Sequence, residues 1–397
     1  MQIEGALSAV RNAIEAADLM TVSPPLPVEI VSRSAQLDVA VQEMAAGSQA
    51  IALDTESNSR HRYPEQLCLI QIATKQKVHL IDTISLKDIA PLKEVLEDDS
   101  IKKVVHGADY DIRCLDRHYG FRIRNLYDTS IAARFAGIAK FGLADLIEKL
   151  LGVTILKSER LQQADWGRRP LSAEALEYAS TDVLHLFALR EILDQRLQSL
   201  GRTAWVAEEC ARLEEVRYAA PDLETAYLRV KGAKELDGRG LAVLRSLFLF
   251  RDQESRRQSR PPFFVIPDTA LITLAASPTA NLSKFPGLGQ TGLQRFGRGL
   301  QQAVREGLAA PPIERPLKLV KRPSHEQVDR LSSLKAWRAS LSAALSLDPS
   351  LLWPTASLER LAKAPDTFDS ELDCDDIRHW QRDSFASSLR AHLKSLP

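Results

Sequence analysis

The sequence is poor in cysteine, has no excess charge of either sign and contains no apolar run long enough to cross a membrane. Its four cysteines form no C-x-x-C motif, which argues against a disulfide framework and against a cysteine zinc site. We therefore expect a reducing, cytoplasmic environment and no membrane attachment. The formal net charge of zero argues against a protein that coats nucleic acid, but it leaves room for local basic patches that bind phosphate.

The length and composition suit a globular protein of several domains. At 397 residues, the chain is expected to form two or three of them. Hydrophobic residues make up 45% and charged residues 26%, which are ordinary values for packed soluble domains. The limits of each domain must therefore come from the local pattern of residues.

Short β-rich segments separated by turn residues fill the region from 29 to 83. They read EIVSR, AIALDTES, LCLIQIAT and KVHLIDT. A helix over 86–98 and a strand over 102–107 follow, and the pattern is then almost entirely helical, with a long helix from about Ser172 to Leu200. Strands first and helices afterwards predict an α/β layered domain.

The rest of the chain divides into helical blocks joined by proline-rich segments. Both blocks have a long helix, a loop with proline and a final amphipathic helix, so the second is a candidate repeat of the first. The predicted segments are an N-terminal helix and linker at 1–27, the α/β domain at 28–205, a helical domain at 208–310, a linker at 311–323, and a diverged helical domain at 324–397.

Two acids interrupt the apolar strand IALDTES, namely Asp54 and Glu56. Residues two apart on a strand point to the same side, so a solvent-facing strand edge is the simplest explanation. Two neighbouring carboxylates nevertheless repel each other unless a cation lies between them. The pair therefore indicates a cation site only if further acids lie close to it.

Further acids follow in HGADYDIRCL, where a strand gives way to a helix. Asp109 and Asp111 are both suited to the helix N-terminus, so helix capping is an alternative explanation for each. Helical side chains advance by roughly 100° per residue, so these two point about 200° apart. Ile112 and Leu115 mark the side that packs on the sheet, and Asp111 adjoins that side. Asp111 is therefore the candidate ligand, and Asp109 the candidate cap.

A third cluster, EALEYASTDVLHL, places Tyr178 and Asp182 on one helix face, four residues apart. Taken alone, they are explained as a half-buried tyrosine and a surface aspartate. Together the three clusters offer four hard oxygen ligands, the set that Mg²⁺ or Mn²⁺ prefers. Two such ions about 3.5–4 Å apart can flank a displacement at phosphorus. The predicted ligands are Asp54, Glu56, Asp111 and Asp182, and Tyr178 is the candidate for holding the attacking water.

The motifs LDTES, HGADYDIRCL and YASTD, with LQQADWGRRPLSAEALEYA before the last, resemble those of the ribonuclease D family. This family belongs to the DEDD exonuclease superfamily, in its tyrosine variant. The resemblance implies a ribonuclease H-like fold, the same four acids as metal ligands and Tyr178 as the residue that positions water. The two helical blocks resemble HRDC domains, so the expected fold is an α/β ribonuclease H-like exonuclease domain followed by two all-α HRDC-like domains.

The resemblance implies a metal-dependent 3′→5′ exoribonuclease that uses two divalent ions, Mg²⁺ or Mn²⁺. Its expected partner is structured RNA, tRNA precursors in particular, and its expected products are nucleoside 5′-monophosphates. No obligate protein partner is evident. The alternatives are a DNA 3′→5′ exonuclease of the same superfamily and a catalytically inactive RNA-binding protein. The intact acids argue against the second alternative.

Arginines of the first helical block suit contacts to phosphates, which give affinity without sequence choice. For any single arginine, a solvated helix face is the alternative explanation. The predicted nucleic-acid contacts are Gln163, Trp166, Arg168, Arg245, Arg251, Arg256 and Arg257.

Overall fold

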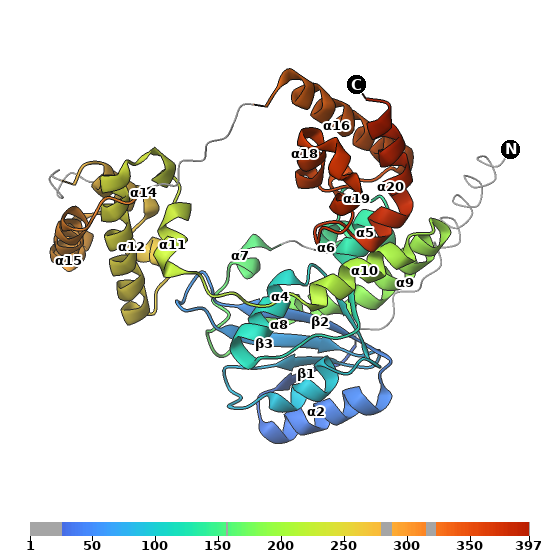
Figure 1. Cartoon of the computed structure of the whole chain (residues 1–397). Helices are drawn as coiled ribbons and strands as arrows, with labels where there is room; N and C mark the ends of the chain where they lie inside the picture. Colours follow the sequence, from blue (N-terminus) through green and yellow to red (C-terminus); the bar gives the residue numbers. More distant parts are fainter. Residues whose placement is uncertain (1–25, 156–157, 279–287, 315–322, 397) are drawn as a thin grey trace.

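The computed structural model describes residues 26–155, 158–278, 288–314 and 323–396 (Figure 1). The predicted N-terminal helix and most of the predicted linker at 311–323 lie outside the described residues. None of the helices described is long and apolar enough to span a membrane.

One mixed sheet of six strands forms the centre of the first domain. Strands β2, β3 and β4 form an antiparallel meander, and β1, β5 and β6 add parallel strands at its sides, in the order β1-β4-β3-β2-β5-β6. Every residue of β3 is buried, as expected for a strand covered on both faces. The strands are β1 Val28–Val31, β2 Ala50–Ser57, β3 Leu67–Ala73, β4 Val78–Ile81, β5 Lys102–Val105 and β6 Leu126–Asp128.

Helices pack around this sheet, with α2 below it and α9 and α10 above it in Figure 1, and α8 packs across β2, β3 and β4. The α/β layered domain predicted from the sequence is therefore confirmed. Its helical elements are α2 Ser34–Gly47, η2 Ala90–Leu92, α3 Lys93–Leu96, α4 Asp109–Tyr119, α5 Thr129–Phe135, α6 Leu143–Leu151, α7 Glu159–Gln162, α8 Ala173–Leu184, α9 Leu186–Ser199 and α10 Thr203–Glu214.

Two elements of the first domain differ from the sequence-based prediction. Helix α2 lies inside the region predicted to hold only strands, and its buried residues Leu37, Ala40, Val41 and Met44 follow helical spacing. The predicted helix from Ser172 to Leu200 is divided at His185 into α8 and α9. The division lets α8 pack across β2, β3 and β4, whereas α9 packs against α5 and α6.

The two C-terminal blocks are helical, as predicted, and repeat one order of elements. In each, a long helix leads to a short helix that starts with proline, then to a nine-residue helix whose N-cap is proline, and ends with a long helix. The first block contains α11 Leu223–Ala226, η3 Tyr227–Arg229, η4 Ala233–Glu235, α12 Gly238–Gln258, α13 Pro262–Val265, α14 Asp268–Ala276 and α15 Gln290–Ala309. The second contains α16 His325–Leu345, α17 Pro349–Leu352, α18 Thr355–Lys363, η6 Pro365–Thr367, α19 Phe368–Glu371 and α20 His379–Lys394.

The buried apolar side chains form two separate cores. One lies within the first helical block, and the other is shared by the α/β domain and the second helical block. Helix α10 belongs to the shared core, because its Val206 and Cys210 are buried there. The first core thus extends past the predicted limit at 205, and the helical domain predicted from 208 has its own core only from Tyr227 onward.

Aromatic stacking and buried polar contacts hold the second helical block on the α/β domain. The rings of Trp205 and Trp380 stack with centroids 4.7 Å apart, and Phe135 meets Trp380 edge-on at 5.2 Å. The guanidinium of Arg202 donates to the carbonyl oxygens of Phe135 and Leu345 at 2.8 and 2.7 Å. These contacts join segments far apart in the sequence into one packed body.

We expect the two cores to unfold as two cooperative units. Trp380→Ala should destabilise the shared core by about 3–5 kcal/mol, because it removes a large buried ring. Leu300→Ala, in a fully buried position of α15, should destabilise the other core by about 2–5 kcal/mol. Differential scanning calorimetry of the full chain should show each variant lowering a different transition. A single transition that both variants shift equally would contradict the division.

Candidate active site

Strand β2 supplies the first two acids of the site. It lies between β3 and β5, and it presents Asp54 and Glu56 two residues apart, both half-buried. Its regular pairing with β3 ends just after Glu56, where the register shifts. Leu53 and Thr55, which alternate with the acids, are buried. The two carboxylates thus lie near the end of a strand that the sheet fixes on both sides.

Helix α4 supplies Asp111, whose side chain is only 5% exposed. The hydroxyl of Thr55 donates a hydrogen bond to its carboxylate. The carboxylate of Asp128 accepts hydrogen bonds from the backbone N–H groups of Gly107 and Ala108 at 3.0 and 2.8 Å, which fixes the turn that leads into α4. Asp109 lies on the surface and pairs with Arg113 at 2.9 Å. The two aspartates therefore have different environments, and only Asp111 is buried beside β2.

Helix α8 supplies Asp182 and Tyr178. The Ser172 hydroxyl caps its N-terminus by accepting a hydrogen bond from the Ala175 N–H at 3.2 Å. Packing of α8 across the meander brings Asp182 to the acids of β2. Oxygen atoms of Asp54, Glu56 and Asp182 all lie within 4.8 Å of one another, so three carboxylates from two elements meet at one point.

Burial and mutual repulsion disfavour the ionised forms of these acids. Burial, then the charges of Asp54, Asp182 and Asp111, raise the pKa of Glu56 to about 10. Burial followed by Asp54 raises the pKa of Asp182 to about 8, and burial raises that of Asp54 to about 6. The pKa of Asp111 is raised well above its ordinary value, by burial and then by Asp54. Within the described chain, no lysine or arginine forms an ion pair with any of the four.

Tyr178 lies beside this cluster with its hydroxyl group protonated. Burial, and then the charges of Asp182 and Glu56, raise its pKa above the ordinary value. Asp182 and the side chain of Gln162 are its polar neighbours. Its ring lies against that of Trp166, with centroids 6.1 Å apart. The hydroxyl group is thus held at the edge of the acid cluster by two polar neighbours and a buried ring.

Known proteins with similar sequences match this chain over most of its length. A family model described as 3′-5′ exonuclease matches residues 28–198, and an HRDC domain model matches residues 240–304. Ribonuclease D of Granulibacter bethesdensis is 32% identical over 349 residues, which cover 86% of each chain. The chain belongs to the ribonuclease D family. The predicted hydrolase activity of a 3′→5′ exoribonuclease is thereby confirmed.

Two solved structures share this architecture. RNase D of Escherichia coli superposes with a TM-score of 0.72 over 94% of this chain and 100% of that one, at 24% identity. That enzyme is described as an exoribonuclease involved in structured RNA processing. The catalytic core of RRP6 from Trypanosoma brucei gives a TM-score of 0.64 at 25% identity, covering 75% of this chain and 87% of that one.

Two of the predicted RNA contacts of this ribonuclease D family member are buried. Trp166 is 1% exposed, so its ring supports Tyr178 and offers no face to a base. Arg251 is 6% exposed and donates to the Asp268 carboxylate at 2.6 Å and to the Ile266 carbonyl oxygen at 3.1 Å. Both predictions are corrected, because these side chains stabilise the interior of their domains.

The other predicted RNA contacts reach the surface to different degrees. Gln163 and Arg168 are exposed, on the segment between α7 and α8. Arg245, Arg256 and Arg257 each pair with an acid, namely Glu224, Asp252 and Glu254 respectively. These three arginines are already neutralised locally, and their part in RNA binding stays a prediction.

Sequence analysis missed three residues that support the site. Asp128 is the N-cap of α5 and also holds the turn before α4. The sequence Asp-Thr-Ser before a helical run is a capping signal that points to this residue. Thr55 and Gln162 gave no local signal, because their roles arise from contacts with Asp111 and Tyr178 on other elements.

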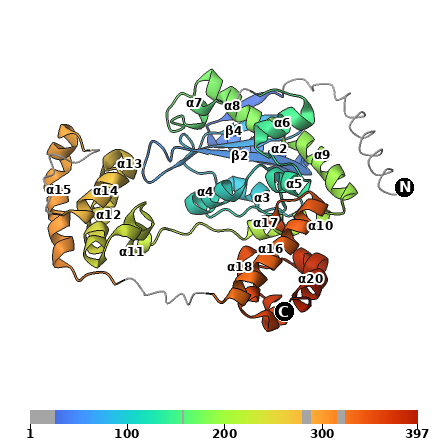
Figure 2. The ribbon, with the colours of Figure 1, turned by 90° about the horizontal axis from the view of Figure 1, so that it is seen from above.

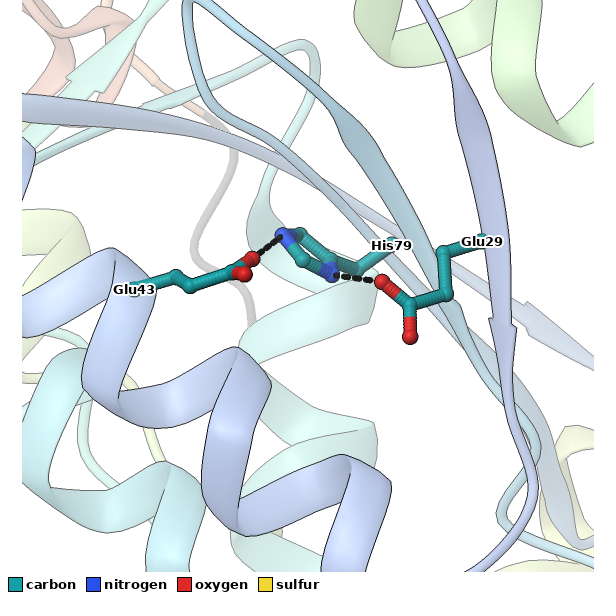
Figure 3. Close-up of side chains that lie close together, drawn as sticks. All are labelled: Glu29, Glu43 and His79. Atoms are coloured by element: carbon teal, nitrogen blue, oxygen red, sulfur yellow. Dashed lines mark ion pairs between the residues drawn. The ribbon is translucent and has the colours of Figure 1, made fainter.

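Another cluster of metal-ligand types, Glu29, Glu43 and His79, lies between helix α2 and strands β1 and β4 (Figure 3). Lys77 donates to a carboxylate oxygen of each glutamate at 3.0 Å, so a cation is already in place. The two ring nitrogens of His79 face different glutamates, each at 3.8 Å. We therefore regard this cluster as an ion-pair network, unlike the acids of β2.

The raised pKa values predict that the metal-free protein loses stability as the pH rises. Folded Glu56 keeps its proton up to a pKa of about 10, whereas the unfolded chain releases it near the ordinary value of 4.5. Between these values the native state binds more protons, so stability falls with increasing pH. In EDTA, thermal unfolding between about pH 5 and about pH 9 should show this fall.

Glu56→Gln should flatten that pH profile, because glutamine has no proton to lose. The same substitution at the exposed Glu177 of α8 should leave the profile like that of the wild type. Added Mn²⁺ should stabilise the wild type most at high pH, where protons compete least with the metal ion for the carboxylates. Identical profiles for the Glu56→Gln variant and the wild type would show that repulsion within the cluster does not limit stability.

Proposed function

We propose that this exoribonuclease trims the 3′ ends of structured RNA, tRNA precursors among them, with two divalent ions, Mg²⁺ or Mn²⁺, and releases nucleoside 5′-monophosphates. The observation that carries the proposal is a group of four neighbouring carboxylates with which no cationic side chain of the described residues forms an ion pair. Hard oxygen donors at such spacing suit Mg²⁺ or Mn²⁺. The carboxylates that would hold the ions are those of Asp54, Glu56, Asp111 and Asp182.

The reaction class follows from the family and the donors. When bound, the ions would stabilise negative charge on the attacking and leaving oxygens at phosphorus. Water attacks the terminal phosphodiester, the bond from phosphorus to the 3′ oxygen of the preceding nucleotide breaks, and a nucleoside 5′-monophosphate leaves. The protonated hydroxyl of Tyr178 orients the water, since it lies beside Asp182 and cannot easily ionise. Trp166 limits the motion of the tyrosine ring.

Structured RNA is the substrate class that the whole chain suits best. The HRDC-like blocks add surface beyond the catalytic domain, and the related enzyme of Escherichia coli is described as acting in structured RNA processing. A DNA exonuclease is the second candidate, because the chemistry at phosphorus would be the same. Matched RNA and DNA strands separate the two, and we expect the RNA to be trimmed faster.

The proposal is tested with purified full-length protein and a tRNA that carries a 3′ extension. We expect stepwise shortening with release of nucleoside 5′-monophosphates in Mg²⁺ or Mn²⁺, and none in excess EDTA. Asp111→Asn should abolish cleavage while RNA binding survives, because a ligand of the ions is lost. Shortening in EDTA at the same rate would rule out the metal-dependent mechanism.

Asp109→Asn is the matched control for Asp111→Asn. The two aspartates stand in the same first turn of α4, yet Asp109 is exposed and only pairs with Arg113. Its loss should cost at most about 1 kcal/mol, as for a surface ion pair or a helix-end charge, and should leave most of the activity. Single-turnover cleavage and thermal unfolding measure both effects. If the Asp111→Asn variant is active and the Asp109→Asn variant is inactive, then Asp109 is the metal ligand and the assignment of Asp111 is wrong.

Tyr178→Phe tests the role of the hydroxyl group alone. The substitution keeps the ring against Trp166 and removes the polar group beside Asp182 and Gln162. We expect kcat to fall by about 10²–10⁴-fold, the usual range for a positioned proton-transfer or water-orienting group. Metal and RNA affinity, measured by calorimetry and filter binding, should change little. Wild-type kcat in the variant would reduce Tyr178 to a packing residue.

A further inference from the structure

Two adjacent phenylalanines on the first helical block are more exposed than any other large hydrophobic side chain in the described chain. Phe263 is 53% exposed and Phe264 57%. Both lie in α13, the short helix between α12 and α14, and their ring centroids are 4.6 Å apart. Single exposed apolar residues are common on protein surfaces, whereas two large neighbouring rings call for an explanation.

The fold does not need these two rings. The next two residues, Val265 and Ile266, are 5% and 0% exposed and anchor α13 in the core of the block. Neither phenylalanine belongs to that core or packs against it as a partly buried member. Substitutions at Phe263 and Phe264 should therefore leave the domain folded.

A basic side chain without an acidic partner lies beside the rings. The guanidinium of Arg260 is 5.7 Å from the centroid of the Phe264 ring, a cation–π distance. In the described residues, no carboxylate pairs with Arg260. Its neighbours Arg256 and Arg257, by contrast, are paired with Asp252 and Glu254. The aromatic pair is thus accompanied by one positive charge that is still available to an anion.

The aromatic pair lies at the end of α12 that touches the catalytic domain. Tyr63, in the loop that follows β2, donates a hydrogen bond to Asp252, and the Arg256 guanidinium lies 5.2 Å from the Tyr63 ring centroid. Figure 2 shows α13 on the side of the first helical block that faces the sheet. His61 of the same loop contacts the backbone oxygen of Gln163, and the preceding residue, Gln162, is a polar neighbour of Tyr178. One loop therefore lies between the aromatic pair and the catalytic residues.

We propose that Phe263, Phe264 and Arg260 form a stacking platform for an unpaired segment of the RNA substrate. This inference rests on the proposed function and adds a contact to it. Bases of any identity stack on the exposed rings, and Arg260 contacts a phosphate of the same segment. The platform holds single-stranded RNA outside the catalytic centre and takes no part in the cleavage step.

The chemistry of the surface favours an unpaired strand over other partners. Bases within a duplex are stacked on each other and offer no free face to the rings. A stable protein partner usually covers about 800 Å² on each side, which two side chains and an arginine do not provide. An RNA strand needs only a ring face and a cation at intervals of one nucleotide, and this surface supplies both.

The test measures the affinity of full-length protein for an unpaired RNA oligonucleotide and for a blunt RNA hairpin. All proteins carry Asp111→Asn so that the RNA survives. Phe263→Ala/Phe264→Ala should weaken oligonucleotide binding by about tenfold or more, the effect of losing one or two stacked bases. Hairpin binding should change little. Phe263→Tyr/Phe264→Tyr should restore the affinity, because tyrosine rings also stack.

Salt dependence separates stacking from charge. The alanine double variant should keep the slope of log affinity against log salt, whereas Arg260→Gln should reduce the slope by roughly 0.7, the value for one phosphate contact on a single strand. Leu308→Ala, on the exposed part of α15 in the same block, is the matched control and should bind like the parent. Thermal unfolding of each variant checks that the block is folded.

Two results would overturn the platform. One is an alanine double variant that binds the oligonucleotide as tightly as the Leu308→Ala control. The other is an equal loss of affinity for the oligonucleotide and the hairpin, which would indicate a general surface defect. If the wild type trims RNA and the double variant binds normally, only the platform is wrong. If the wild type neither binds nor trims RNA, the proposed function fails as well.

Discussion

Mutual repulsion among four neighbouring carboxylates is the constraint on which the site depends. Two lie on one strand and the others on helices α4 and α8, so three separate elements must be held together against this repulsion. The opposing forces are ordinary ones. Pairing with β3 and β5 fixes β2, Asp128 fixes the turn before α4, and apolar packing holds α8 across the meander. The repulsion among the carboxylates therefore lowers the stability of the folded chain, and bound divalent cations would relieve it.

Neutralisation separates this site from other acidic clusters in the described chain. Glu29 and Glu43 share Lys77, and Glu371 and Asp376 share Arg360. Each of those clusters carries its own cation and adds to stability without a ligand. Among the described residues, the four acids of the site are left without one, so charge balance, more than the number of acids, marks this cluster as the candidate metal centre.

The sequence predicted the features that depend on local spacing. Asp54 and Glu56 are two apart on a strand, and Tyr178 and Asp182 are four apart on a helix, so each pair shares a side by backbone geometry alone. Surface availability was predicted less well, because it depends on partners distant in the sequence. Arg251 looked like its neighbouring arginines, yet Asp268 and the Ile266 carbonyl oxygen hold it inside. Trp166 was predicted to contact nucleic acid, yet it is buried and packs against Tyr178.

The same reasoning explains why the aromatic pair was overlooked in the sequence. In the sequence, these two residues belong to the predicted loop with proline, a pattern that says nothing about which of its side chains are exposed. A turn of helix can bury only part of its surface, and here Val265 occupies the buried part. The two rings are left outside, beside the arginine whose charge no described acid neutralises. In the described residues, exposed rings and an unpaired charge, like the unpaired acids of the candidate metal centre, indicate a ligand that the folded chain does not itself supply.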